Sequence, residues 1–484
     1  MKKAKIVATI GPASESTKVL KELSKAGVNV FRLNFSHGTH EEHGKKIDNI
    51  RKLGLPGAIM LDTKGPEIRT GEVRDKLFVK TGDKFTITIN KGVYEDTGKI
   101  SVNYKNFLKD VDVDDVISFD SGVMFAKAIK KTKTDIEFKV VNGQTNITTK
   151  RHINLFGKPV SLPTVTEQDW KDIDFGIEKK VDMIALSFVR SAEDVKEVRD
   201  YCIAKGHKHV KIISKIENYE STQNIDEIIE ESDGIMVARG DLACEIPFSK
   251  VPAVQKKIIR LCNLYKKPVI VATQMLLSMT DNAQPTRAEV SDVANAIYDG
   301  ADAVMTSDET TKGVNPVGCI EVMAKIVEDT EEEIYSCDCG CDCGDDCDCD
   351  DDCDCGCDCG CGSHEIGGCH CGCRDTEGIL TILPKYTDFI DAIVVLSDKV
   401  EYTNSVACAR YDLPILSFVS NQTIANNLHL VWNTTPFVIK ASKNVESSIS
   451  DVEKTLKKNY KDAIETYLLV FEMNGCLTVQ IRDL

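Results

Sequence analysis

Eight short apolar runs, each typical of a buried β-strand, alternate with helix-like stretches along residues 1–309. The stretches between them, such as 17–27, 191–206 and 287–300, carry apolar residues every three or four positions, as one face of an amphipathic helix requires. Continuously apolar strands that alternate with helices predict a parallel sheet covered by helices, and eight such units predict an α/β fold of the (β/α)8 TIM-barrel type. The runs are 5–11, 28–36, 57–64, 182–189, 210–217, 234–242, 268–275 and 302–309.

The third and fourth runs are separated by about 118 positions, far more than one connecting helix needs. Residues 70–165 fill this gap with alternating apolar and polar residues and with Gly and Asn turns, which predicts an inserted small β-barrel lid domain. Apolar runs and helical stretches after position 374 predict a C-terminal α/β domain. The expected organisation is a barrel of 1–69 and 166–336, a lid of 70–165, a Cys/Asp/Gly-rich insertion of 337–373 and a domain of 374–484.

The acidic charge of the chain excludes some classes of partner. Segment 337–373 holds ten Asp, one Glu and no Lys or Arg, so it supplies −11 of the formal charge of −16. An acidic chain argues against bulk binding to nucleic acid or to an anionic membrane. No run approaches 18 apolar residues, and the first residues lead into a strand instead of a signal core. Six cysteines outside the segment are scattered singly, so we expect a cytoplasmic protein in a reducing compartment.

Charged residues follow several of the predicted strands, where a barrel of this kind places its active site. Lys215 and Glu217 are two positions apart on one strand and therefore point to the same face, the barrel mouth. Asp241 follows the neighbouring strand. Two carboxylates suit Mg²⁺, which takes one or two carboxylates together with phosphate oxygens. The alternative is a purely structural Lys215–Glu217 salt bridge.

Two further groups of strand-end residues bear on the chemistry. Gly240 lies at a predicted helix start, where free N–H groups favour a phosphate, and with the nearby cations this indicates phosphoryl transfer. Asn34, Ser36, Asp62 and Thr63 offer oxygens that could hold a second cation. For Asn34 and Ser36 the alternative is helix capping after the second strand.

Seven segments at these strand ends resemble the pyruvate kinase family, in the same order along the chain. They are KIVATIGPAS, FRLNFSHG, LDTKGPEIRTG, ISKIEN, VARGDL, ATQML and PTRAEVSDVANAI. The resemblance covers residues 1–335 closely and residues 374–484 only loosely. It implies transfer of the phosphoryl group of phosphoenolpyruvate to ADP, giving pyruvate and ATP in the last step of glycolysis. It also implies Mg²⁺ (or Mn²⁺) and K⁺ as cofactors and a homotetramer as the usual assembly.

The resemblance assigns roles to single residues of this sequence. Lys215 stabilises the transferring phosphoryl group, Arg32 contacts phosphate, and Thr273 relays a proton to the enolate, assisted by Ser307 and Glu309. The implied contacts to phosphoenolpyruvate are Arg32, Lys215, Gly240, Asp241 and Thr273. The implied Mg²⁺ ligands are Glu217 and Asp241, and the implied K⁺ ligands are Asn34, Ser36, Asp62 and Thr63. Glu67 is the residue type found in K⁺-dependent members. The implied nucleotide contacts are Asn34, Phe35, Ser36, His37, Arg69 and Arg151.

Several positions depart from the family pattern. Those near the site are Ala243, Leu277, Thr306 and Asp308, and the lid has Arg151 and His152 where the family has Lys and Gly. Asp308 adds negative charge near an anionic substrate, so we expect weaker binding or a compensating cation. In the C-terminal domain, residues 397–405 contain Asp398 and Glu401 and no glycine, so regulation by a sugar phosphate is not expected.

Segment 337–373 is a separate feature, with 14 of the 20 cysteines and no counterpart in the resemblance. Its dense C-x-C pairs resemble metallothioneins, and thiolates at this density select Zn²⁺ or Cu(I), with His364 and His370 as further ligands. The alternative is a solvated acidic repeat at a permissive surface position between domains.

Two other functions use the same barrel. The first is a pyruvate-kinase-like pseudo-enzyme or metal-responsive protein, in which the barrel is only a scaffold. The second is a lyase of a phosphoenolpyruvate-related superfamily that needs only Glu217, Asp241 and Mg²⁺. Lys215, Arg32, Thr273 and the lid favour the kinase. The lyase, in contrast, has no use for the second cation set or for the lid.

Overall fold

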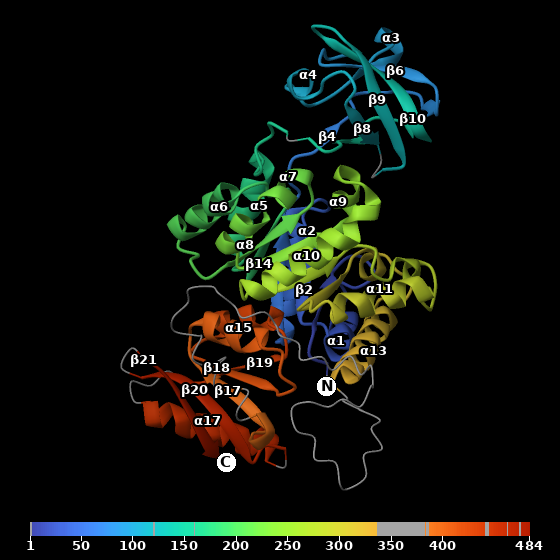
Figure 1. The fold of residues 1–484 in the computed structure, drawn as a ribbon. Coiled ribbons are helices and arrows are strands. Elements are labelled where there is room, and N and C mark those ends of the chain that lie inside the picture. The colour runs from blue at the N-terminus through green and yellow to red at the C-terminus, as the bar shows by residue number, and fades with distance from the viewer. Residues whose placement is uncertain are drawn as a thin grey trace, which may run out of the picture.

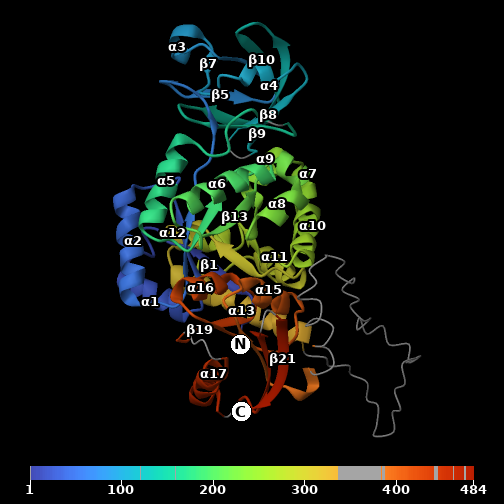
Figure 2. The same cartoon turned by 90° about the vertical axis from the view of Figure 1, so that its left-hand side faces the viewer.

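The computed structural model describes residues 2–119, 122–158, 160–335, 383, 387–440, 445–461, 463–473 and 476–484. Segment 337–373 lies outside the described residues, and so does the metal binding predicted for it. Within the described residues the chain forms a central barrel, a lid on one side of it and a C-terminal domain on the other (Figures 1 and 2).

The predicted (β/α)8 barrel is confirmed. Its eight parallel strands close in the order β1-β16-β15-β14-β13-β12-β3-β2, and each lies within one of the predicted runs. The strands are β1 (Lys5–Thr9), β2 (Val30–Asn34), β3 (Ala58–Asp62), β12 (Met183–Leu186), β13 (Lys211–Ile216), β14 (Gly234–Ala238), β15 (Val269–Ala272) and β16 (Ala303–Thr306). All eight are almost wholly buried, because helices cover one face and side chains fill the interior.

Helices surround the barrel, and several begin at a capping box. Thr39, Thr166 and Thr286 each accept a hydrogen bond from the backbone three residues on, where an acidic side chain bonds back. The long helices are α1 (Thr17–Lys25), α2 (His40–Leu53), α5 (Glu167–Glu178), α6 (Ala192–Ala204), α10 (Val251–Leu264), α11 (Arg287–Tyr298) and α13 (Pro316–Tyr335). The short ones are α7 (Tyr219–Gln223), α8 (Ile225–Glu231), α9 (Arg239–Glu245), η1 (Phe248–Lys250), η2 (Leu277–Thr280) and α12 (Asp308–Thr311).

The inserted all-β unit follows β3 and therefore stands at the carboxyl ends of the barrel strands (Figure 1). Its sheet runs β4-β11-β8-β9-β10-β6-β7, with β5 paired to β10. A single bridge between Thr70 and Val102 joins the two ends of this otherwise open path, in agreement with the small β-barrel lid predicted from the sequence. The elements are β4 (Ile68–Arg69), β5 (Leu77–Lys80), β6 (Lys84–Thr88), β7 (Ile100–Ser101), β8 (Val116–Phe119), β9 (Met124–Lys131), β10 (Asp135–Ile147), β11 (His152–Leu155), α3 (Tyr94–Thr97) and α4 (Phe107–Asp110).

The C-terminal α/β domain closes the opposite end of the barrel. Arg410 donates to Gly300 O at 2.8 Å and to Asp302 Oδ1 at 3.1 Å, and Leu430 packs with the side chains of the barrel interior. Its sheet has the order β19-β18-β17-β20-β21, with β21 antiparallel. The elements are η4 (Thr387–Phe389), β17 (Ala392–Leu396), α15 (Val400–Cys408), β18 (Ile415–Val419), α16 (Gln422–Asn427), η5 (Leu428–Leu430), β19 (Thr434–Val438), α17 (Val445–Tyr460), β20 (Thr466–Met473) and β21 (Cys476–Asp483).

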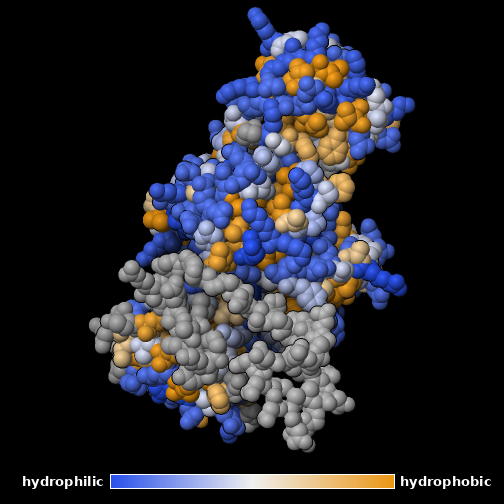
Figure 3. All heavy atoms as spheres, in the orientation of Figure 1, coloured by the Kyte–Doolittle hydropathy of each residue, from blue (hydrophilic) through white to orange (hydrophobic). Residues whose placement is uncertain are grey.

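The surface mixes hydrophobic and hydrophilic residues. In Figure 3 the hydrophobic residues reach the surface in separate groups between hydrophilic ones. Across the ranges that the structure describes, we find no helix with the length and apolar character needed to span a membrane.

Candidate active site

A cavity of about 920 Å³ opens at the carboxyl ends of β1, β2 and β16. Its walls come from the loops after these strands and from the first turns of α2 and α12. The predicted residues Arg32, Asn34 and His37 line it. Lys215, Glu217, Asp241 and Thr273 do not line it, so the cavity meets the other predicted site residues only at Arg32, Ser307 and the end of β2.

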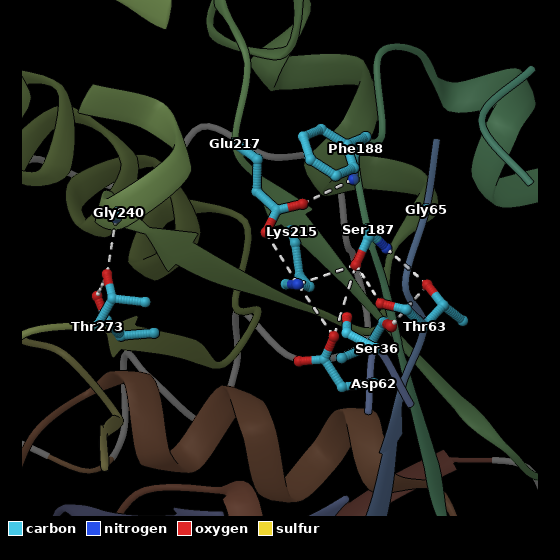
Figure 4. Close-up of polar contacts among 12 residues, drawn as sticks. Ser36, Asp62, Thr63, Gly65, Ser187, Phe188, Lys215, Glu217, Gly240 and Thr273 are labelled. Atoms are coloured by element: carbon cyan, nitrogen blue, oxygen red, sulfur yellow. Dashed lines mark hydrogen bonds and ion pairs between the residues drawn. The ribbon is translucent and has the colours of Figure 1, made fainter. Parts of the chain in front are cut away.

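Lys215, at the end of β13, lies among oxygen atoms from three neighbouring strands (Figure 4). Its Nζ is 3.0 Å from Asp62 Oδ1 and 2.8 Å from Glu217 Oε1, and it donates to Ser187 Oγ at 2.9 Å. Burial by itself lowers the pKa of Lys215, but the two carboxylates more than offset this and raise it. The structure therefore fixes a charged ammonium in the mouth of the barrel.

Arg32, on β2, places a second cation next to the same carboxylate. Its Nε donates to Asp62 Oδ2 at 2.6 Å and its Nη1 donates to Thr9 Oγ1 at 2.8 Å. Burial alone would raise the pKa of Asp62, yet Arg32 and Lys215 hold it below its ordinary value. Asp62 is thus an ionised carboxylate that orients both cations toward the substrate side.

Glu217 and Asp241 form the predicted carboxylate pair. Burial raises the pKa of Glu217 to about 7, with Asp241 adding to the effect, and burial also raises the pKa of Asp241. Phe188 N donates to Glu217 Oε2 at 2.8 Å, whereas Asp241 has no hydrogen-bond or ion-pair partner among the residues described. Two carboxylates whose charges interact, one of them without an ion-pair partner, fit a divalent cation. The alternative Lys215–Glu217 ion pair is present as well.

A metal at this pair would depend on the substrate for further ligands. In the described part of the chain, no three His, Cys, Asp or Glu side chains are grouped as a metal site.

Thr273 follows β15 in an unusual backbone conformation. Its φ is +69° and that of Gln274 is +56°, which is uncommon for non-glycine residues and strained for a β-branched one. The Thr273 hydroxyl accepts from Gly240 N at 2.8 Å and donates to Ala272 O at 2.6 Å (Figure 4). A Cβ on Gly240 would meet Thr273 only at 3.6 Å or more, so this contact does not require glycine there.

The four oxygen-bearing residues predicted to hold a second cation come from the adjacent ends of β2 and β3. Asn34 and Asp62 are register partners, and Phe35 N donates to Asp62 O at 2.9 Å, which brings the residues after the two strands, Ser36 and Thr63, to the same edge (Figure 4). Asn34 Oδ1 accepts from Ser36 N at 3.1 Å, and Thr63 Oγ1 accepts from Ser187 N at 3.0 Å. The capping alternative is wrong, because Thr39 is the N-cap of α2.

The predicted nucleotide contacts do not all meet. Asn34 and His37 line the cavity, whereas Phe35 is buried against the ring of His43. Arg69 and Arg151 lie at the base of the lid and do not line the cavity. Arg69 donates to both oxygens of Glu67, at 2.8 and 2.6 Å, and Arg151 donates to Thr148 Oγ1 at 3.0 Å.

The departures from the family pattern have local explanations. Asp308 is on the cavity wall, and Lys312 Nζ lies 3.0 Å from its carboxylate, so the expected compensating cation is present. Buried Thr306 shares a hydrogen bond of 3.0 Å with the Thr310 hydroxyl. Ala243 packs beside Leu242 and Ile246. Nothing in the structure explains Leu277.

Two site residues were missed from the sequence. Ser187 Oγ receives the Lys215 hydrogen bond and itself donates to Thr63 O at 2.6 Å, and Thr9 Oγ1 receives that of Arg32. Ser187 directly follows strand β12 in the fourth apolar run, and Thr9 is the last residue of strand β1 in the first run. The strand-end rule would have found them if it had been applied to those two runs.

Comparison with known proteins identifies the family of this chain. The family model "Pyruvate kinase, barrel domain" matches residues 1–320, and "Pyruvate kinase, alpha/beta domain" matches residues 387–474. A pyruvate kinase of Geobacillus stearothermophilus is 50% identical over 340 residues, which are 69% of this chain and 58% of that protein. One of Clostridium acetobutylicum is 38% identical over 466 residues, 95% of this chain and 94% of the relative.

The fold leads to the same family. A crystal structure of a pyruvate kinase from Cryptosporidium parvum superposes with a TM-score of 0.87 at 31% identity, covering 100% of this chain and 96% of that one. The chain therefore belongs to the pyruvate kinase family.

Proposed function

We propose that this protein is an active pyruvate kinase that transfers the phosphoryl group of phosphoenolpyruvate to ADP. The observation that carries the proposal is the position of Lys215, whose ammonium lies between Asp62 and Glu217 at 3.0 and 2.8 Å. Phosphoryl transfer needs positive charge fixed in advance around the moving group, and two buried carboxylates fix this charge.

The reaction breaks the P–O bond to the enol oxygen and forms a P–O bond to the terminal phosphate of ADP. Lys215 and Arg32 neutralise charge on the moving group and on the substrate phosphate. The enolate that remains takes a proton on carbon, and the Thr273 hydroxyl would relay it once released from the Ala272 carbonyl. Glu217 and Asp241 would hold Mg²⁺ or Mn²⁺, which would supply further neutralisation of the phosphoryl oxygens.

The second cation would be K⁺ at Asn34, Ser36, Asp62 and Thr63. Three of these residues offer neutral oxygens and one offers a carboxylate, which suits a monovalent ion next to the two carboxylates of the divalent site. Ionised Asp62 contributes to this set while it holds Arg32 and Lys215.

ADP would occupy the 920 Å³ cavity, with His37 and Asn34 on its wall. Arg69 and Arg151 belong to the lid and would reach the nucleotide only after the lid moves toward the barrel. We further propose that the protein is cytoplasmic and forms a homotetramer. Light scattering of the purified protein tests the homotetramer.

A separate proposal concerns segment 337–373 and rests on its composition. Fourteen thiols and two histidines would bind Zn²⁺ or Cu(I) and release protons as they do so. Titration of the full chain and of a 337–373 deletion with Zn²⁺ against a chromophoric chelator tests this. Equal stoichiometry in the two proteins would discard it.

A coupled assay for pyruvate separates the proposed function from its alternatives. A kinase forms pyruvate only when ADP is present, together with Mg²⁺ and K⁺. Pyruvate formed equally without ADP would point to hydrolysis of phosphoenolpyruvate and against a kinase, and no turnover of phosphoenolpyruvate to pyruvate under any of these conditions would point to the lyase or the pseudo-enzyme.

A further inference from the structure

His43, on the first turn of α2, lies beneath the loop that connects β2 to this helix. Its side chain is almost fully buried, with 3% of the residue exposed. Its Nε2 is 2.7 Å from the carbonyl oxygen of His37. A carbonyl only accepts, so His43 Nε2 carries a hydrogen and donates it.

The ring of His43 is also held by stacking. It lies parallel to the Phe35 ring, with centroids 4.1 Å apart and planes inclined by 14°. Phe35 in turn contacts Phe175 of α5, and His40 stacks on Phe175 at 4.6 Å while its Nε2 lies 2.6 Å from Asp172 Oδ1. Packing against the barrel thus fixes the direction of the His43 donor.

The neutral form of His43 fits its surroundings. Burial lowers the pKa of this imidazole, and its Nδ1 is buried without a hydrogen-bond partner among the described residues. A second proton on Nδ1 would therefore be an unsatisfied buried donor. The neutral ring keeps its hydrogen on Nε2, where the His37 carbonyl accepts it.

The loop wraps tightly around this donor. Gly38 has φ +79°, and a Cβ there would lie 3.2 Å from His43 Nε2 and 3.1 Å from Glu42 Oε2. Within the loop, Asn34 Oδ1 accepts from Ser36 N at 3.1 Å and Asn34 O accepts from His37 N at 3.4 Å, a long contact. The His43 hydrogen bond is thus the shorter restraint on the end of the loop that bears His37.

We propose that His43 is a positioning residue for nucleotide binding. Its Nε2–H holds the His37 carbonyl, and thereby holds loop 34–38 in the shape that presents Asn34 and His37 to the cavity. This inference rests on the proposed function, since it concerns the nucleotide cavity of a kinase. His43 also lines one edge of the cavity, but the His37 carbonyl engages its Nε2 donor, so we expect it to act through the loop and not by touching the reacting atoms.

Two substitutions separate the hydrogen bond from the stacking. His43→Phe keeps an aromatic ring on Phe35 but removes the donor, whereas His43→Gln places an amide N–H near the position of Nε2. We expect the Phe variant to raise KM for ADP at least tenfold, about 1.4 kcal/mol. KM for phosphoenolpyruvate and kcat should change less than about threefold, and Gln should restore most of the ADP affinity. His209→Gln, at an exposed site, is the control.

Equal KM values for ADP in the Phe variant and the wild type would overturn the inference. A lower kcat together with higher KM values for both substrates, not restored in His43→Gln, would also overturn it, because this pattern indicates a purely structural role. If His43→Phe does not fold, Gln and Asn provide the comparison, since the shorter Asn amide does not reach the His37 carbonyl. Calorimetric titration with ADP distinguishes the two levels of proposal. A wild type that does not bind ADP rejects the proposed function, whereas wild type and variant that bind equally reject only the role of His43.

Discussion

Lys215→Met removes the ammonium that lies between two buried carboxylates, Asp62 and Glu217. Deleting one partner of a buried ion pair costs about 3–5 kcal/mol when the remaining charge stays uncompensated. In this site the charge of each carboxylate can be compensated in another way. Arg32 Nε remains 2.6 Å from Asp62 Oδ2, and Glu217, whose pKa burial already raises to about 7, takes up a proton. We therefore expect the free energy of unfolding to fall by only about 1–3 kcal/mol, which leaves a folded protein.

The same variant should lose far more activity than stability. Removing one preorganised donor from a developing charge typically lowers kcat about 10²–10³-fold. Urea unfolding in EDTA and the coupled pyruvate assay measure the two effects separately. The double variant Lys215→Met/Glu217→Gln removes the charge that the single variant leaves behind, so it should regain stability without regaining activity.

Two results would refute this reasoning. Near-normal kcat in Lys215→Met would show that the ammonium does not stabilise the transferring group. A loss of folding that Glu217→Gln does not relieve would show that the carboxylates are not what Lys215 compensates.

Three further predictions address other parts of the site. Gly65→Ala should lower the free energy of unfolding in urea by more than about 1 kcal/mol, because φ is +71° and the new Cβ would lie 2.6 Å from Phe188 Cδ2. Gly206→Ala is the control, since Gly206 also has positive φ but lies in open space, and it should cost less. Burial raises the pKa of Glu245 to about 8, so between about pH 4.5 and 8 the folded state keeps a proton that the unfolded state loses. The free energy of unfolding should therefore fall by about 1.4 kcal/mol per pH unit over this range. Glu245→Gln should flatten this slope in thermal unfolding, and an unchanged slope would contradict it. Replacement of K⁺ by tetramethylammonium at constant ionic strength should suppress turnover, and full activity without an alkali cation would rule out the K⁺ site.

The barrel could be predicted from the sequence because its strands are buried on both faces. Such strands are apolar at every position, so each run stands out from the amphipathic helices around it. Strand β21 was missed although its sequence was open to prediction, because Thr478, Gln480 and Arg482 alternate with apolar residues, which is the period of a half-buried strand. It lacks the continuous apolar run by which the other strands of this domain were recognised. The order of the strands within the lid sheet was beyond prediction, since it depends on pairing between distant segments.

The candidate site was predicted as a set of residues but not as a set of contacts. Strand-end position places Lys215, Glu217 and Asp62 at one edge, yet it does not show that Lys215 bonds Asp62 from a strand two places away in the barrel. His43 could not be recognised, since in the run HEEHGKK it reads as one polar residue of an exposed helix start. The Asp308–Lys312 pair has the i, i+4 spacing of a helix pair and was open to prediction.

The most direct test of the account follows the phosphoryl group itself. Phosphoenolpyruvate labelled with ³²P is mixed with ADP, Mg²⁺, K⁺ and the full-length protein, and labelled ATP and pyruvate are measured at early times. The account predicts one labelled ATP for each pyruvate from the wild type, and both rates reduced together in Lys215→Met/Glu217→Gln. Pyruvate with release of labelled inorganic phosphate and no labelled ATP, or equal ATP formation by the double variant, would contradict it.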